Sequence, residues 1–183
     1  MTLANAIGIM SAGTLDVGGK NITSSGMISG AGSLSINGGG RLSLVGNNAY
    51  AGDTAISGGT RVTLGTGTPD GLSSGLVSLT GASTLELGFS NAVFDNRLSG
   101  LSSETVQVTG SNILLSANNT GFSGTWDVTG GAGISGTSAA VINNMGNDSL
   151  VYLHGCSLDL VTTDTAAAAF VFDNAMTGTG VLN

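Results

Sequence analysis

Residues 41–64 read RLSLVGNNAYAGDTAISGGTRVTL and contain three short runs in which aliphatic and polar residues alternate. The runs cover residues 41–44, 55–57 and 60–64. An alternation with a period of two is typical of a β-strand with one face buried. Glycine and asparagine separate the runs, as at Gly58 and Gly59, where turns often need a positive φ. Each predicted strand is too short to bury a core alone, so the strands must stack on others.

The composition of the whole chain favours a β-rich protein. Of 183 residues, 32 are glycine and one is proline, while charged residues make up 8% and aromatic residues 4%. A helical bundle is excluded because the chain is poor in the Lys, Glu and Arg that cover exposed helix faces. Low charge argues against intrinsic disorder, and glycines without a period of three exclude collagen. We therefore expect strands with Ser, Thr, Asn and Gly on their solvent side.

The chain repeats itself at a nearly regular interval. Leu15 recurs as Leu85, an interval of 70 (85 − 15), and Phe94 recurs as Phe172, an interval of 78 (172 − 94). The recurring segments are 13–17 with 82–87 and 156–160, 47–59 with 118–131, and 93–96 with 171–174. The intervals drift in order, as small insertions in a true repeat would require. We predict one domain, 1–183, with modules at about 13–81, 82–154 and 155–183, the third incomplete.

Repeated short strands predict an all-β parallel β-helix, in which every coil covers the apolar side of the last. At roughly 20 residues per coil, the chain forms about eight or nine rungs. With rungs about 4.8 Å apart, the rod is roughly 40 Å long. The main alternative is an up-and-down barrel, which requires antiparallel hairpins and does not explain the repeat. An aggregation-prone low-complexity chain would not keep an ordered drift.

The charge of the chain excludes nucleic acid as a partner. The net charge of −7 comes from 11 acidic and four basic residues, and no basic residue follows Arg97. A protein that binds phosphates needs a basic stripe or patch, which is missing here. The single cysteine, Cys156, cannot form an intramolecular disulfide, so packing and backbone hydrogen bonds must stabilise the fold.

Residues 42–62 resemble the autotransporter-associated β-strand repeat. In that family, a strand leads into Asn-Asn-x-Tyr-x-Gly-x-Thr, a second strand, Gly-Gly-Thr and a third strand. The preceding residues 28–34 are similar to the lead-in Ile-Ser-Gly-x-Gly-x-Leu, and 72–75 to the loop Leu-Gly-Ser-Gly. The second copy departs from the pattern, because Phe122 replaces the tyrosine and Trp126 enters the next strand.

The resemblance implies the passenger region of a Gram-negative autotransporter. Such passengers are right-handed parallel β-helices, exported through an outer-membrane β-barrel of the same polypeptide to the cell surface or the medium. The expected partners are that barrel during export, and afterwards a host surface or another passenger. We expect a stalk with an adhesive interaction surface. The alternatives are an autochaperone region that nucleates folding during export, and a β-helical carbohydrate-active enzyme.

The sequence offers little for catalysis or metal binding. His154 is the only histidine, so any serine-type triad must use it. When residues 79–81 of one module are aligned with residues 153–155 of the next, His154 matches Thr80. This is a position at the end of a predicted strand, with no special role. The Gly-x-Ser-x-Gly pattern at 71–75 has neither the strand before it nor the helix after it that a nucleophile elbow needs. One histidine and Cys156 cannot close a zinc site. We therefore expect no enzymatic activity, no catalytic residues, no cofactor and no metal.

Three acidic residues recur at equivalent positions of the modules: Asp16, Glu86 and Asp159. Being one module apart, they are expected three or four rungs apart, roughly 15 to 19 Å. Paired carboxylates of glycosidases are about 5 to 9.5 Å apart, so these acids do not form such a pair. We expect them to solvate the rod and to oppose sheet stacking by like-charge repulsion.

Two pairs of adjacent asparagines, at 47–48 and 118–119, occupy matching positions of the repeat. Asparagine tolerates the left-handed conformation and forms ladders between equivalent turns. We therefore predict a structural role for both pairs.

The candidate interaction surface comprises Tyr50, Trp126 and the segment that begins at Thr163, Asp164 and Thr165. The two aromatic side chains either form an exposed contact or pack inside, as aromatic residues that flank strands commonly do. The interval between repeats lengthens by five at this segment. An insertion of this kind projects towards a binding face or covers an exposed rung edge.

Overall fold

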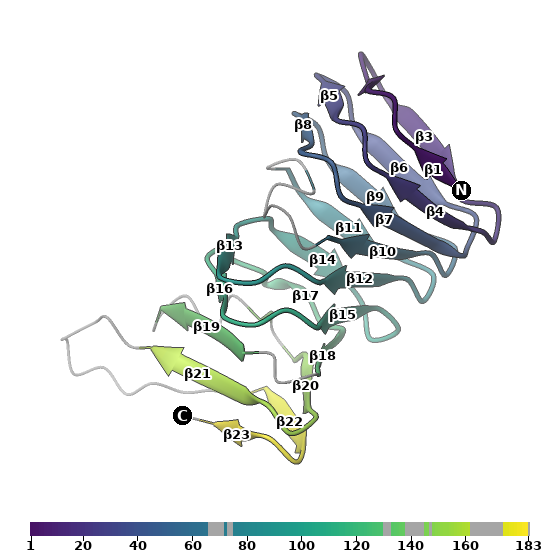
Figure 1. The fold of residues 1–183 in the computed structure, drawn as a ribbon. Coiled ribbons are helices and arrows are strands. Elements are labelled where there is room, and N and C mark those ends of the chain that lie inside the picture. The colour runs from purple at the N-terminus through teal and green to yellow at the C-terminus, as the bar shows by residue number, and fades with distance from the viewer. Residues whose placement is uncertain are drawn as a thin grey trace.

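The protein is a stack of short parallel strands. The computed structural model describes residues 1–65, 72, 75–129, 133–137, 145–146, 148–161 and 174–182. These residues form 23 strands and no helix. Figure 1 shows the strands lying one behind another along the molecule, from the purple N-terminal end to the yellow C-terminal end.

The strands belong to four sheets, which we name A to D. Sheet A consists of β1 (Thr2–Leu3), β4 (Asn21–Ser24), β7 (Arg41–Leu44), β10 (Arg61–Leu64), β12 (Thr84–Leu87), β15 (Thr105–Val108), β18 (Thr125–Val128), β20 (Leu150–Leu153) and β22 (Ala175–Gly178). Sheet B consists of β2 (Ile7–Gly8), β5 (Ile28–Gly30) and β8 (Ala49–Tyr50). Sheet C consists of β3 (Gly13–Asp16), β6 (Leu34–Asn37), β9 (Thr54–Ile56), β11 (Val77–Leu79), β14 (Leu98–Gly100) and β17 (Gly121–Phe122). Sheet D consists of β13 (Ala92–Phe94), β16 (Ile113–Leu115), β19 (Gly133–Thr137), β21 (Ser157–Val161) and β23 (Val181–Leu182).

The chain winds through these sheets in a fixed order. It passes from sheet A to sheet B and then to sheet C before it returns to sheet A, and from β13 onward sheet D takes the place of sheet B. From β18 onward the described strands alternate between sheets A and D. One column of sheet A in register reads Thr2, Thr23, Ser43, Thr63, Glu86, Gln107, Asp127, Tyr152 and Thr177. The differences between these numbers are 21, 20, 20, 23, 21, 20, 25 and 25. A coil therefore takes roughly 20 to 25 residues, a length common among solenoid repeats.

This arrangement confirms the predicted parallel β-helix. Every strand pair among the described residues is parallel, so the antiparallel barrel is wrong. Sheet A has nine strands, one on each coil, and eight or nine rungs were predicted. The right-handed sense stays a prediction from the family resemblance.

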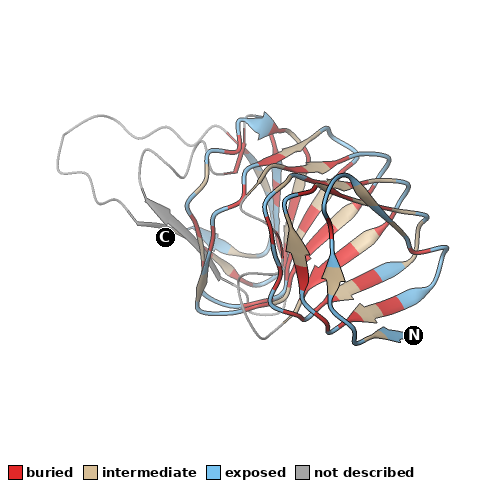
Figure 2. Cartoon of the chain, turned by 90° about the horizontal axis from the view of Figure 1, so that it is seen from above, coloured by how far each residue is buried: buried red, intermediate tan, exposed pale blue. Residues whose placement is uncertain are grey.

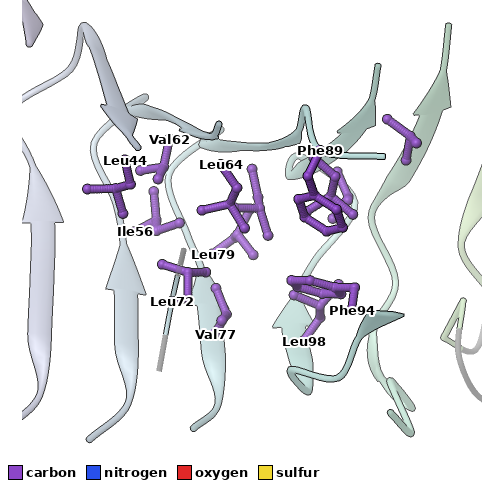
Figure 3. Close-up of a cluster of buried hydrophobic side chains, with 14 of the residues drawn as sticks. Leu44, Ile56, Val62, Leu64, Leu72, Val77, Leu79, Phe89, Phe94 and Leu98 are labelled. Carbon is purple, nitrogen blue, oxygen red and sulfur yellow. The ribbon is translucent and has the colours of Figure 1, made fainter. Parts of the chain in front are cut away.

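The core is built by the alternation read from the sequence. In β7, Leu42 and Leu44 are buried while Arg41 is exposed. Figure 2 shows this pattern as red bands that alternate with tan and blue bands along the strands. Leu42 pairs in register with Val62 of the next coil, so inward side chains stack in rows. In Figure 3 such side chains from successive coils meet in one continuous apolar interior.

The predicted turns need their glycines. Gly38, Gly39 and Gly40 have φ values of +89°, +71° and +77°. A Cβ atom at Gly40 would lie 2.4 Å from the backbone oxygen of Lys20. Only glycine fits there, because another residue would push apart two coils that are hydrogen-bonded to each other.

The second asparagine of each pair has the predicted structural role, but through a bond to the backbone of the preceding coil and without the left-handed conformation that was expected. The Oδ1 atom of Asn48 accepts a hydrogen bond from the backbone N–H of Ile28 at 2.8 Å. Asn119 accepts one from the backbone N–H of Leu98 at 2.7 Å in the same way. Both asparagines are buried, and each satisfies a backbone donor at the start of a strand one coil earlier.

The sequence repeat and the coil have different periods. An interval of about 70 residues divided by a coil of about 21 gives roughly 3.3 turns. Related strands therefore lie in different sheets: β3, β12 and β21 belong to sheets C, A and D. Asp16, Glu86 and Asp159 occupy equivalent positions of the repeat and therefore lie in three different sheets. The alignment of 79–81 with 153–155 likewise relates a strand of sheet C to a strand of sheet A.

Candidate functional site

The outer face of sheet A carries a continuous row of interacting polar side chains, which we call the sheet A ladder. It consists of Arg41, Arg61, Thr63, Glu86, Gln107, Thr109, Asp127 and His154. The strands of sheet A from β7 to β20 direct their first and third residues outward, and successive coils place these positions in register. Thr109 and His154 directly follow their strands. The ladder lies on six consecutive levels of the sheet, from β7 to β20. Five intervals of about 4.8 Å give it a length of roughly 24 Å.

Glu86 is the centre of the ladder. Its Oε2 atom is 2.9 Å from Nη2 of Arg41 and 3.5 Å from Nε of Arg61, and it accepts a hydrogen bond from the Thr63 hydroxyl at 2.9 Å. The Glu86 side chain is 11% exposed, whereas those of Arg41 and Arg61 are 44% and 36% exposed. A carboxylate this buried requires charged partners. The predicted role of Glu86 as a solvated, repelling acid is therefore wrong.

The ladder continues towards the C-terminal end through amide and carboxylate groups. Arg61 donates a hydrogen bond to Oε1 of Gln107. The amide of Gln107 donates to Oδ2 of Asp127 at 3.0 Å. The other oxygen of Asp127 is 2.9 Å from Nε2 of His154, whose ring lies edge-on to the ring of Tyr152 with a centroid distance of 4.2 Å. Polar contacts thus link side chains from six coils.

His154 faces an acid that the sequence analysis did not connect with it. The numbers of the two residues differ by 27 (154 − 127), which is the register interval of 25 from Asp127 to Tyr152 plus the two-residue step to His154. Predicting this contact would have required the pairing register of β18 with β20, which the sequence does not reveal. The His154 side chain is 45% exposed and that of Asp127 24%, so the pair lies on an open face. Among the described residues, no group of three His, Cys, Asp or Glu side chains is close enough to hold a metal ion.

Charge is distributed unevenly along the rod. Residues 1–97 contain four bases and five acids, a net charge of −1, whereas residues 98–183 contain six acids and no base, a net charge of −6. The ladder shows the same trend, with Arg41 and Arg61 near one end and Asp127 near the other. Beyond Asp127 the outer face becomes apolar, because Leu150 and Tyr152 are 39% and 36% exposed.

The aromatic residues predicted for an interaction surface are buried. Tyr50 is 2% exposed, and its hydroxyl is 2.6 Å from Oγ1 of Thr54. Trp126 is fully buried and donates its indole N–H to the backbone oxygen of Met145 at 2.8 Å. Neither residue contributes to a surface. Of the two alternatives for these aromatic side chains, packing inside the protein is the one that the structure shows. Thr163, Asp164 and Thr165 lie outside the described residues. The exposed aromatic of this region is Tyr152, at the third position of β20.

A hollow of about 320 Å³ lies at the N-terminal end of the stack. Its walls come from β2, β3 and the residues around them, together with Ile28 and Leu34 of the second coil. No charged side chain lines it. The hollow is lined mainly by apolar residues of the first coils, together with the polar side chains of Ser11 and Thr14.

No family model, no curated protein and no solved structure matches the chain. The class of protein is therefore defined by geometry: it is a parallel β-solenoid with a polar ladder on one outer face. In the part of the chain that the structure describes, no helix is long and apolar enough to cross a membrane.

Proposed function

We propose that this chain is a β-helical segment of an exported autotransporter passenger, which acts as a stalk and presents the sheet A face as an interaction surface. The observation that carries the proposal is the sheet A ladder, a polar row in register on the face of a stack of coils. The likeness of residues 42–62 to the passenger repeat supports it. The protein works outside the cell or on its surface, after export through the barrel of the same polypeptide. Its later partners are a host surface or another passenger.

The architecture suits a stalk that folds as it emerges. Each coil forms its hydrogen bonds and apolar contacts with the coils next to it, so the rod lengthens by repeated addition. Folding can therefore advance from a completed coil without waiting for a distant segment. Exposed Ser, Thr and amide groups keep the faces of the rod soluble.

The role that we propose is not enzymatic. Both oxygens of Glu86 are engaged: Oε2 with Arg41, Arg61 and Thr63, and Oε1 with the hydroxyl of Thr109 at 3.4 Å. The carboxylate of Asp127 is likewise held between Gln107 and His154. Acids held in this way support a rigid face for binding better than proton transfer to a substrate.

A surface-display experiment tests the export of the chain. The gene is fused ahead of an autotransporter barrel, with a disulfide staple formed by Thr105→Cys and Thr125→Cys in a Cys156→Ser background. These threonines are paired in register on neighbouring strands. Their Cα atoms are about 4.8 Å apart, inside the range of roughly 4.4–6.8 Å that a disulfide allows. We expect the fusion without the staple to reach the surface, and the stapled fusion to stay in the periplasm until reductant is added.

Display is measured by cleavage of the passenger with protease added outside the cell. The Cys156→Ser fusion and the Thr105→Cys single variant are the matched controls, and both should be cleaved with or without reductant. If the Cys156→Ser fusion is never cleaved, although it is synthesised and its barrel is inserted, the export proposal is wrong.

A further inference from the structure

We propose that the fold selects Asn118 as an acceptor for N-linked glycosylation, in which a transferase attaches a sugar to the side-chain amide nitrogen. Asn118, Asn119 and Thr120 fit the acceptor pattern Asn-x-Ser/Thr. Asn119 is buried and bound to the preceding coil, whereas Asn118 has no part in the core or in the sheet A ladder. The modification goes beyond the proposed function, and neither depends on the other.

The acceptor pattern occurs three times in the chain, beginning at Asn21, Asn118 and Asn147. Asn147 lies outside the described residues. Asn21 and Asn118 are both exposed, so exposure does not distinguish them. The backbone conformation of the two patterns does.

At Asn118 the pattern forms an Asx turn, in which a side-chain oxygen binds the backbone two residues further on. The Oδ1 atom of Asn118 accepts a hydrogen bond from the backbone N–H of Thr120 at 3.1 Å. Within the part of the chain that the structure describes, Nδ2 of Asn118 donates no hydrogen bond. Thr120 is exposed as well. A transferase can therefore reach both the amide nitrogen and the threonine of the pattern.

At Asn21 the same pattern is held extended in β4. The backbone N–H of Thr23 donates to the backbone oxygen of Met1 at 2.9 Å, as part of the pairing of β4 with β1. This N–H is therefore taken up by the sheet and does not bind the Asn21 side chain. The pattern at Asn21 lacks the Asx turn for this reason.

An extra residue in the second copy of the repeat creates the turn. One residue stands between the second asparagine and the aromatic residue in the first copy, and two stand there in the second copy. In the first copy, the residue after the asparagine pair, Ala49, already belongs to β8. In the second copy, Thr120 lies before β17, and the N–H of Phe122 closes a turn on the backbone oxygen of Asn119 at 2.8 Å. The N–H of Thr120 is thereby released from the sheet.

The transfer forms one bond and breaks one. The donor is a sugar activated at C1 by a diphosphate, which is carried on a nucleoside or on a polyprenyl lipid. Nδ2 of Asn118 attacks C1, the bond from C1 to the diphosphate oxygen breaks, and the diphosphate leaves with the electron pair. Nδ2 loses a proton to a base of the transferase. The N–H of Thr120 stabilises the negative charge that Oδ1 gains as this proton leaves.

The site lies at a corner of the rod, between β16 of sheet D and β17 of sheet C. N-linked sugars are bulky and solubilising. At this corner a sugar leaves the sheet A ladder uncovered. The modification is therefore compatible with the interaction surface proposed above.

Transfer to the purified, folded chain tests the proposal, with mass spectrometry of proteolytic peptides as the readout. One arm uses a soluble transferase with UDP-glucose, and the other a membrane transferase with a polyprenyl-diphosphate-linked glycan. Each enzyme is chosen because it modifies unfolded synthetic peptides of residues 16–26 and 113–123. Relative to these peptides, we expect Asn118 of the folded chain to be modified at least about tenfold faster than Asn21. The arm in which this occurs identifies the carrier of the sugar.

Two variants provide matched controls, and circular dichroism verifies that both are folded. Asn118→Gln removes the acceptor and should abolish modification at this corner. Ala49→Thr completes the acceptor pattern at the exposed Asn47 of the first copy, but inside β8 and without the turn, so Asn47 should stay unmodified.

The proposal is overturned if both enzymes leave Asn118 of the folded chain unmodified. It is also overturned if Asn21, or Asn47 in the Ala49→Thr variant, is modified as fast as Asn118. Neither result affects the display experiment, which follows export and not modification.

Discussion

Glu86 shows how a side chain that points outward becomes buried. The alternation in β12 correctly directs it away from the core, since Leu85 and Leu87 on either side are fully buried. Its cover comes from Arg41, which reaches over from two levels earlier in sheet A. A sequence pattern within one strand could not reveal this contact, because it depends on the lengths of two intervening coils.

We expect Glu86→Gln to reduce the free energy of unfolding by about 1–2 kcal/mol. Removing one partner of a fully buried ion pair would cost more. The loss is smaller here because water screens the partly exposed arginines. The change removes the charge that Arg41 and Arg61 share and leaves two guanidinium groups close together. Urea unfolding followed by circular dichroism measures the effect. Asp16→Asn, at an exposed position of sheet C, should stay within about 0.5 kcal/mol of the unaltered chain.

At the scale of elements, the sequence predicted the strands and their buried faces better than it predicted their neighbours. The alternation in β18 itself places Trp126 inward, beside Val128, and the structure buries both. The contact between Asp127 and His154 was not predictable in this way. It requires a register interval of 25 between β18 and β20, whereas the two preceding intervals in sheet A are 21 and 20.

The asparagine pairs give a test at the same scale. We expect Asn119→Ala to destabilise the protein by about 1–3 kcal/mol, because the buried N–H of Leu98 at the start of β14 loses the acceptor that the structure shows. Asn118 is the first residue of the same pair. Its Oδ1 atom accepts a hydrogen bond from the backbone N–H of Thr120, within the same turn and not from another coil. Asn118→Ala should therefore change the stability by no more than about 0.5 kcal/mol. Thermal and urea unfolding compare the two variants, and equal losses would contradict the assigned role of Asn119.

The whole molecule behaves as a one-dimensional array, because strands pair only with the coils directly before and after them. The sequence predicted this array from its repeat. It could not predict which side of the rod each motif occupies, since the repeat interval is not a whole number of coils. The recurring segments 47–59 and 118–131 illustrate the point: β8 and β9 of the first lie in sheets B and C, whereas β17 and β18 of the second lie in sheets C and A.

A truncated chain tests the array. We expect residues 1–129, which end after the seventh strand of sheet A, to fold into a shorter rod with the same β-type circular dichroism spectrum. The dependence of its unfolding free energy on urea should fall to about 70% of the full-length value, because that slope scales with the surface exposed on unfolding. A closed barrel would lose its structure entirely on such a cut. An unfolded fragment would therefore argue against independent coils.

The remainder of about one third of a turn has a consequence for how such a protein can diversify. Each tandem duplication of one repeat unit places the copied side chains on a different sheet of the β-helix from the original side chains. A chemical group copied several times traces a spiral stripe around the shaft. Lengthening the shaft and changing what each of its sides displays are then a single genetic event.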